Sequence, residues 1–176
     1  IDKSEKRDNV MKVMNRLMAE GLTKEQAAGV VGNLLEESGL RFWAHNKEGG
    51  GQGAQGIAQW RGSRIDEFRK RYGKEVTDSS LEEQTDYLIW ELNNKFKKVF
   101  DKIKNSSGTK EAAEIMLKEF EKPGNVGEAV VNRRTNSSIS ALNLYNEEIG
   151  GGYEFFRRPA DTWDIPSAII TLNKNV

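Results

Sequence analysis

Most of this 176-residue chain follows the spacing of amphipathic helices. Apolar residues recur three or four positions apart, and two capping boxes, Thr23 to Gln26 and Ser80 to Glu83, mark helix starts. Residues 41–61 break this period; they hold five glycines and predict a loop or a small β-hairpin. The predicted fold is therefore mainly α (α+β), a helical bundle around a central helix with a small hairpin beside it. Helices are expected over residues 10–21, 23–39, 63–72, 81–92, 96–103, 109–120 (capped by Thr109) and 128–149.

The length fits one domain with a short appendage. We expect a domain over residues 1–152 and a C-terminal extension or linker strap over residues 153–176, which hold two prolines and no period. Because the chain begins with Ile rather than Met, we expect a fragment or a processed product. The first residues lack the apolar core of a signal peptide, and no apolar run approaches the roughly 20 residues of a membrane span.

Composition narrows the chemistry that this chain can perform. It has no Cys, and His45 is its one histidine, which excludes disulfides, thiolate metal sites, a Cys nucleophile and multi-histidine metal sites. We expect no metal and no cofactor. The 27 basic residues balance the 27 acidic ones, which gives no global attraction to nucleic acid or to anionic lipid. Carboxylates, amides, hydroxyls and aromatic rings remain for any chemistry.

One carboxylate stands out on the expected helix over residues 23–39. At about 100° per residue, Glu36 lies opposite the apolar stripe, whereas Glu37 lies at the boundary between core and exterior. Partial burial and the negative end of the helix dipole would both raise the pKa of Glu37, as a general acid requires. Asn33 stands one turn earlier on nearly the same face. The interior glycines Gly29 and Gly32 suggest that a backbone or a ligand packs closely on that helix.

The glycine-rich stretch 51–56 matches the residue pattern of the dinucleotide fingerprint G-x-G-x-x-G but lacks the strand and the helix that should flank it. Polar residues precede it, and no helix of sufficient length follows before Gly62, so nucleotide binding is disfavoured. The alternative is a tight hairpin that brings Gln55, Gln59 and Trp60 alongside the second helix. Amides and an aromatic face suit a neutral sugar polymer. His45 is expected to be a surface or hydrogen-bonding residue rather than a base.

Two segments taken together resemble a known family. They are residues 29–39, GVVGNLLEESG, and residues 53–60, GAQGIAQW. They resemble the phage tail lysozyme family and, more widely, the lysozyme and lytic transglycosylase superfamily, with further similarity at residues 88–94 and 120–125. The resemblance covers roughly residues 10–145 and implies a lysozyme-like fold. Two positions depart from the family pattern: residues 40–43, LRFW, replace an Asn-Pro pair, and Phe120 replaces a frequent Tyr.

The resemblance implies a bacteriolytic glycosidase that cleaves the β-1,4 bond between N-acetylmuramic acid and N-acetylglucosamine in peptidoglycan. Glu37 takes the position of the catalytic acid, and Gln59 that of a glutamine at the floor of the site. Glu48 is the first candidate for a second carboxylate and Glu121 the next. The expected substrate-binding residues are Asn33, Ser38, His45, Gln55, Gln59 and Trp60.

Three functional alternatives stay open. A second carboxylate at a suitable distance would make the protein a hydrolase, either inverting or retaining. Without one, the 6-hydroxyl of the sugar could attack, which would make it a lytic transglycosylase. The third alternative is a non-catalytic peptidoglycan-binding or structural tail module. The expected partners are glycan strands and other tail proteins, but neither nucleic acid nor membrane. The expected location is the virion tail, or the bacterial cell wall or periplasm after release.

Overall fold

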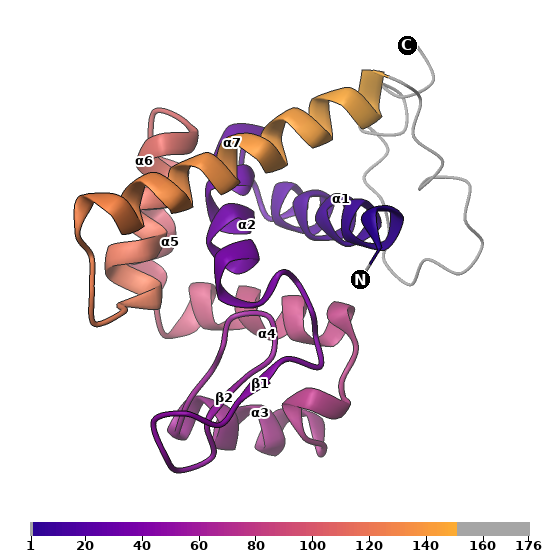
Figure 1. Cartoon of the computed structure of the whole chain (residues 1–176), viewed down its shortest axis with the longest axis vertical. Helices are drawn as coiled ribbons and strands as arrows, with labels where there is room; N and C mark the ends of the chain where they lie inside the picture. Colours follow the sequence, from indigo (N-terminus) through magenta and orange to yellow (C-terminus); the bar gives the residue numbers. More distant parts are fainter. Residues whose placement is uncertain (1, 151–176) are drawn as a thin grey trace.

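The computed structural model describes residues 2–150 and confirms a mainly helical fold with one small hairpin (Figure 1). Its elements, in chain order, are α1 (Lys3–Ala19), α2 (Lys24–Ser38), β1 (His45–Asn46), β2 (Ala54–Gln55), α3 (Ser63–Tyr72), the 3-10 turn η1 (Val76–Asp78), α4 (Leu81–Asn94), α5 (Lys97–Lys104), α6 (Thr109–Ile115), the π-helical turn η2 (Met116–Glu121) and α7 (Glu128–Gly150).

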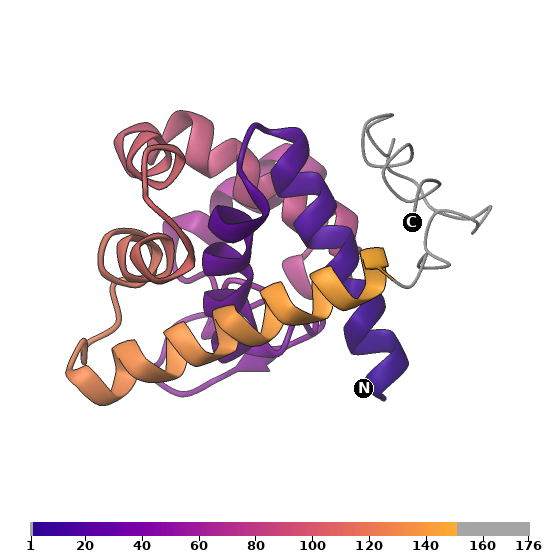
Figure 2. The same ribbon diagram turned by 90° about the horizontal axis from the view of Figure 1, so that it is seen from above.

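Helix α2 runs through the middle of the molecule, and the long helix α7 crosses it (Figures 1 and 2). The close approach depends on two glycines of α2. A Cβ at Gly32 would lie 1.9 Å from the Oγ of Ser138 on α7. A Cβ at Gly29 would lie 2.7 Å from the backbone nitrogen of Ala113 on α6. The two glycines therefore let the backbones of α6 and α7 approach α2 closely. The sequence had suggested either a backbone or a ligand at this place, and the structure shows a backbone.

The two ends of α2 and the start of α4 follow from the predicted caps, whereas α1 begins at Lys3, well before the expected residue 10. Both capping boxes are present, at the starts of α2 and α4. Gly39 ends α2 in the left-handed conformation, with φ 66°. The predicted cap at Thr109 is wrong: Thr109 is the first residue of α6, and its hydroxyl donates to the carbonyl of Glu25 in α2. This hydroxyl holds α6 against α2 instead of closing its own helix.

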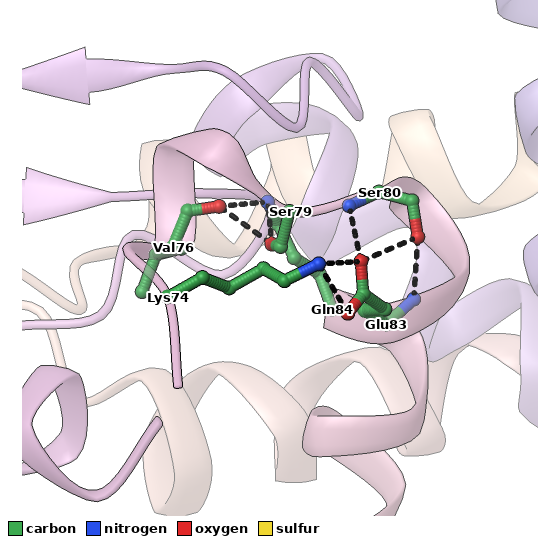
Figure 3. Close-up of polar contacts among 6 residues, drawn as sticks. All are labelled: Lys74, Val76, Ser79, Ser80, Glu83 and Gln84. Carbon is green, nitrogen blue, oxygen red and sulfur yellow. Dashed lines mark hydrogen bonds and ion pairs between the residues drawn. The ribbon is translucent and has the colours of Figure 1, made fainter. Parts of the chain in front are cut away.

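The hairpin is held in place by a buried glutamine of α4. The Oε1 of Gln84 accepts the backbone N–H of Ile57, while its Nε2 donates to the carbonyls of Phe42 and Val76. Figure 3 shows Gln84 beside Ser79, next to the capping box that starts α4. From the other side, Ser38 at the end of α2 donates to the carbonyl of Ile57 at 2.8 Å. The loop that follows the hairpin is thus fixed to α2 and α4 together.

One hydrophobic core joins the helices, and its largest side chains pack near the hairpin. Trp60, Phe68 and Tyr87 form a buried aromatic cluster, with ring centroids 5.1–6.4 Å apart. No helix among residues 2–150 is both long enough and apolar enough to cross a membrane. The predicted extension over residues 153–176 lies outside the described residues, so the proposed division of the chain at residue 152 stays a prediction.

Candidate active site

Glu37 lies in the last turn of α2, where two surface hollows meet. The loop hollow measures about 480 Å³ and the turn hollow about 490 Å³, and both are lined by Glu37, Asn46 and Gln59. The loop hollow is completed by Arg41, Trp43, Ala44 and His45. The turn hollow is completed by Ala54, Ala58, Arg61, Arg64, Glu121, Lys122, Pro123 and Gly124. We call the two together the groove; its wall comes from α2, the hairpin region, α3 and η2.

The Glu37 side chain is partly buried, with 19% of its surface exposed, whereas Glu36 is exposed. Helix geometry predicted this difference between the adjacent carboxylates. The structure adds a partner that the sequence argument did not include. The Nη2 of Arg134, on α7, donates to the Oε1 of Glu37 at 2.8 Å. The Nη1 of Arg134 donates to the backbone carbonyl of Asn33 at 2.9 Å, so one guanidinium ties the C-terminal end of α2 to α7.

A second carboxyl lines the turn hollow from η2. The Oε1 of Glu121 is buried, and among the described residues it has no hydrogen-bond partner. Burial, and next the charge of Glu37, hold the pKa of Glu121 well above its usual range. Arg64 and Arg134 act in the opposite direction, and the charge of Glu91 raises the pKa further. Glu37 and Glu121 are thus two carboxyls in one hollow with different environments.

Arg64 is held by a network behind the turn hollow. Its guanidinium makes two hydrogen bonds to Glu91, at 2.7 and 2.9 Å, and lies 4.7 Å from the ring centroid of Phe120. The Oε1 of Glu91 also accepts the indole N–H of Trp60 at 2.6 Å. Because Glu91 is buried and paired in this way, it serves the wall of the groove rather than its surface.

Of the predicted substrate-binding residues, Gln59 and His45 line the groove. The backbone of Gln59 has φ 52°, a left-handed conformation that costs energy for a residue with a side chain. Its Nε2 is held by the carbonyl of Gly56 at 3.0 Å. His45 is exposed, and its Nε2 lies 3.0 Å from the carbonyl oxygen of Gln52.

Three other predicted residues are buried beside the groove. The Nδ2 of Asn33 donates to the carbonyls of Gly29 and Ala113, and Ser38 bonds to the loop after the hairpin. Gln55 is 5% exposed and belongs to β2. All three support the geometry of the groove from behind and offer substrate little or no surface, which corrects the expectation that they contact it.

The expectation that Trp60 binds substrate is wrong, because Trp60 is fully buried in the aromatic cluster. An apolar ring of that size gains more from the core than from the surface. Trp43, by contrast, is 44% exposed and lines the loop hollow. Trp43, and not Trp60, therefore presents an exposed aromatic face at the groove.

Glu48 is exposed in the loop between β1 and β2 and lines neither hollow. Its backbone carbonyl accepts Arg61, and its backbone N–H donates to Asn46. The structure therefore brings Glu121, rather than Glu48, together with Glu37 in one hollow.

Residues 8–145 match the family model described as phage tail lysozyme. The chain belongs to the phage tail lysozyme family. This membership confirms the resemblance seen in the sequence and agrees with the mainly helical, lysozyme-like fold. It also indicates a lysozyme-like glycosidase with peptidoglycan as its substrate, associated with the phage tail.

Proposed function

We propose that this phage tail lysozyme cleaves the β-1,4 bond between N-acetylmuramic acid and N-acetylglucosamine, with Glu37 as the general acid. The observation that carries the proposal is the position of Glu37 where the two hollows of the groove meet. A glycan strand is a linear polymer, so an acid in the middle of a groove can have sugars on both sides of the scissile bond. Such an arrangement favours cleavage within strands.

In the proposed reaction, protonated Glu37 gives its proton to the glycosidic oxygen as the bond breaks through an oxocarbenium-like state. Gln59 lines both hollows and forms part of the floor under the reacting sugars. The exposed ring of Trp43 offers a flat apolar face for a sugar in the loop hollow. Delivery by the tail would bring the groove to the cell wall.

A lytic transglycosylase acting on the same bond is the second candidate, and one observation favours it. A hydrolase needs an ionised second carboxylate as base or nucleophile. Glu121, which faces Glu37 in the turn hollow, has a raised pKa, and Glu48 lies outside both hollows. Without an ionised partner, the 6-hydroxyl of the muramic acid can attack the oxocarbenium carbon and lose its proton, leaving an anhydro end.

Mass analysis of soluble fragments released from purified cell walls tests the proposal. Reducing ends identify a hydrolase, and anhydro ends identify a transglycosylase. Cleaved peptides, or no soluble fragments at all, would overturn the proposed bond cleavage.

Glu37→Gln tests the role of Glu37 in the same assay. It should reduce fragment release by about 10²–10⁴-fold in a protein that still folds, with a melting temperature lowered by loss of the ion pair with Arg134. Glu36→Gln, one position earlier on the exposed face of α2, is the matched control and should retain activity. A Glu37→Gln protein that releases fragments as fast as the wild type would exclude Glu37 as the acid, and no release by either protein would support the non-catalytic tail module.

A further inference from the structure

The end of the π-helical turn η2 places Glu121 on the wall of the groove. The backbone N–H of Lys122 reaches back five residues to the carbonyl of Leu117 at 2.9 Å, which widens the turn. Lys122 itself has φ 46°, a left-handed conformation that ends the turn directly after Glu121. Such π-helical turns are rare and often occur at functional sites. Here the turn packs Phe120 against Arg64 and leaves Glu121 in the hollow that Glu37 also lines.

The charged groups that face Glu121 come from four helices. They are Glu37 on α2, Arg64 on α3, Glu91 on α4 and Arg134 on α7; Arg61 and Lys122 line the same hollow. Both guanidinium groups are already engaged, Arg64 with Glu91 and Arg134 with Glu37. Among residues 2–150 neither of them forms an ion pair with Glu121, and the Oε1 of Glu121 has no hydrogen bond. A buried carboxylate anion left so poorly compensated is costly, whereas a neutral carboxyl is not.

We propose that Glu121 is a positioning residue of the active site that shares a single proton with Glu37 at neutral pH. In the free protein this proton lies on Glu121, because Arg134 pairs with Glu37. In the reacting arrangement the proton lies on Glu37, from which it passes to the glycosidic oxygen, and Glu121 is ionised; a hydrolase would use this anion as its base, whereas a transglycosylase would not. The inference rests on the proposed function, in which Glu37 is the acid.

The sharing has a definite consequence for the dependence of activity on pH. Removing the last proton from the pair would put two anions in one hollow, so the pair keeps that proton to higher pH than an isolated carboxyl would. The arrangement with the proton on Glu37 therefore stays available through neutral pH. Glu121→Gln keeps the shape of the side chain but fixes it as neutral, so Glu37 can no longer draw on a shared proton.

The test is the pH profile of kcat/KM for release of fragments from cell walls. Glu121→Gln should retain activity at acid pH, with its alkaline limb moved towards acid by about one pH unit or more. Glu119→Gln is the matched control, because Glu119 belongs to the same turn but pairs with Lys102 on the surface; its profile should equal that of the wild type. Melting temperatures show whether each variant folds.

An unchanged alkaline limb in folded Glu121→Gln would overturn the inference, since a purely structural role does not move the limb. Loss of activity at every pH would also overturn it, because Glu121 would then be the proton donor itself. A second measurement needs no substrate: carbon NMR of the labelled Glu121 carboxyl in the wild type and in Glu37→Gln. The pKa of Glu121 should fall when the Glu37 charge is removed, and equal values in the two proteins would contradict the sharing. Should wild-type protein release no fragments, the proposed function fails while this titration still decides whether the two carboxyls are coupled.

Discussion

Arg134 joins α7 to α2, through Glu37 and through the carbonyl of Asn33. Its side chain is only 11% exposed. We expect Arg134→Ala to lower the free energy of unfolding by about 3 kcal/mol, because it leaves a partly buried carboxylate without its donor and removes one hydrogen bond from the carbonyl of Asn33. Urea unfolding measures the loss. Arg133→Ala, on the exposed side of the same turn, should change stability by less than about 0.5 kcal/mol. Similar losses in both variants would show that the ion pair contributes little.

Trp43 is the residue whose contribution to substrate binding can be separated from chemistry. It is 44% exposed and lies at the loop hollow, away from the core. We expect Trp43→Ala to raise KM for soluble glycan strands about tenfold, equivalent to about 1.4 kcal/mol, with kcat nearly unchanged. Steady-state kinetics tests this. Ile139→Ala removes an equally exposed apolar side chain from α7 and should leave KM unaltered; an unaltered KM for Trp43→Ala would remove Trp43 from the binding surface.

At this scale, sequence reasoning located the position of Glu37 but missed its partner. The position follows from local periodicity, because a helix repeats every 3.6 residues. Arg134 lies 97 positions away, and no local pattern links the two residues. One signal was available: Arg134 falls in the buried stripe of α7, between Val130 and Ser138. A guanidinium in such a stripe requires a buried acceptor, which the sequence does not identify.

The crossing of α2 and α7 is the contact between elements on which the site depends. Gly32→Ala would place a methyl group 1.9 Å from the Oγ of Ser138 and 2.4 Å from its backbone nitrogen, so the helices must separate. We expect a loss of about 3 kcal/mol in unfolding free energy and a fall in activity, because α2 carries Glu37 and α7 carries Arg134. Denaturant unfolding and fragment release measure the two effects.

Gly108→Ala provides the comparison for this crossing. No atom lies within 4 Å of the Cβ that it would add, and its backbone is extended, so stability should change by less than about 0.5 kcal/mol. Wild-type stability in Gly32→Ala would mean that α2 and α7 can separate without loss.

The starts of α2 and α4 were predictable at this scale because a cap is a local hydrogen bond within four residues. The π-helical turn was not. Its bond from Lys122 to Leu117 forms as α6 continues towards the groove, where Phe120 packs against Arg64 of α3. Thr109 is a second case that local sequence does not predict. Its hydroxyl donates to the carbonyl of Glu25, which is distant in sequence, and does not cap its own helix. Packing between elements decided both outcomes.

On the scale of the whole molecule, the balance of 27 basic and 27 acidic residues bears on how the domain reaches the wall. A net charge of zero provides no long-range attraction to an anionic surface. The ion pair at the site acts over 2.8 Å and is partly shielded from solvent, so salt screens it weakly. Chemistry and delivery therefore differ in their dependence on ionic strength. A domain carried to the wall by a tail does not need electrostatic steering.

This balance predicts that the rate of wall degradation by the isolated domain changes less than about twofold between 50 and 200 mM salt. The charge-shifted variant Glu5→Lys/Glu147→Lys is the comparison, because both side chains belong to exposed residues outside the groove and each substitution changes the net charge by +2, which makes +4 in all. That variant should degrade anionic walls faster than the wild type at 50 mM salt and lose the advantage at 200 mM. A steep fall of the wild-type rate with salt would instead mean that local basic surface, rather than net charge, brings the domain to the wall.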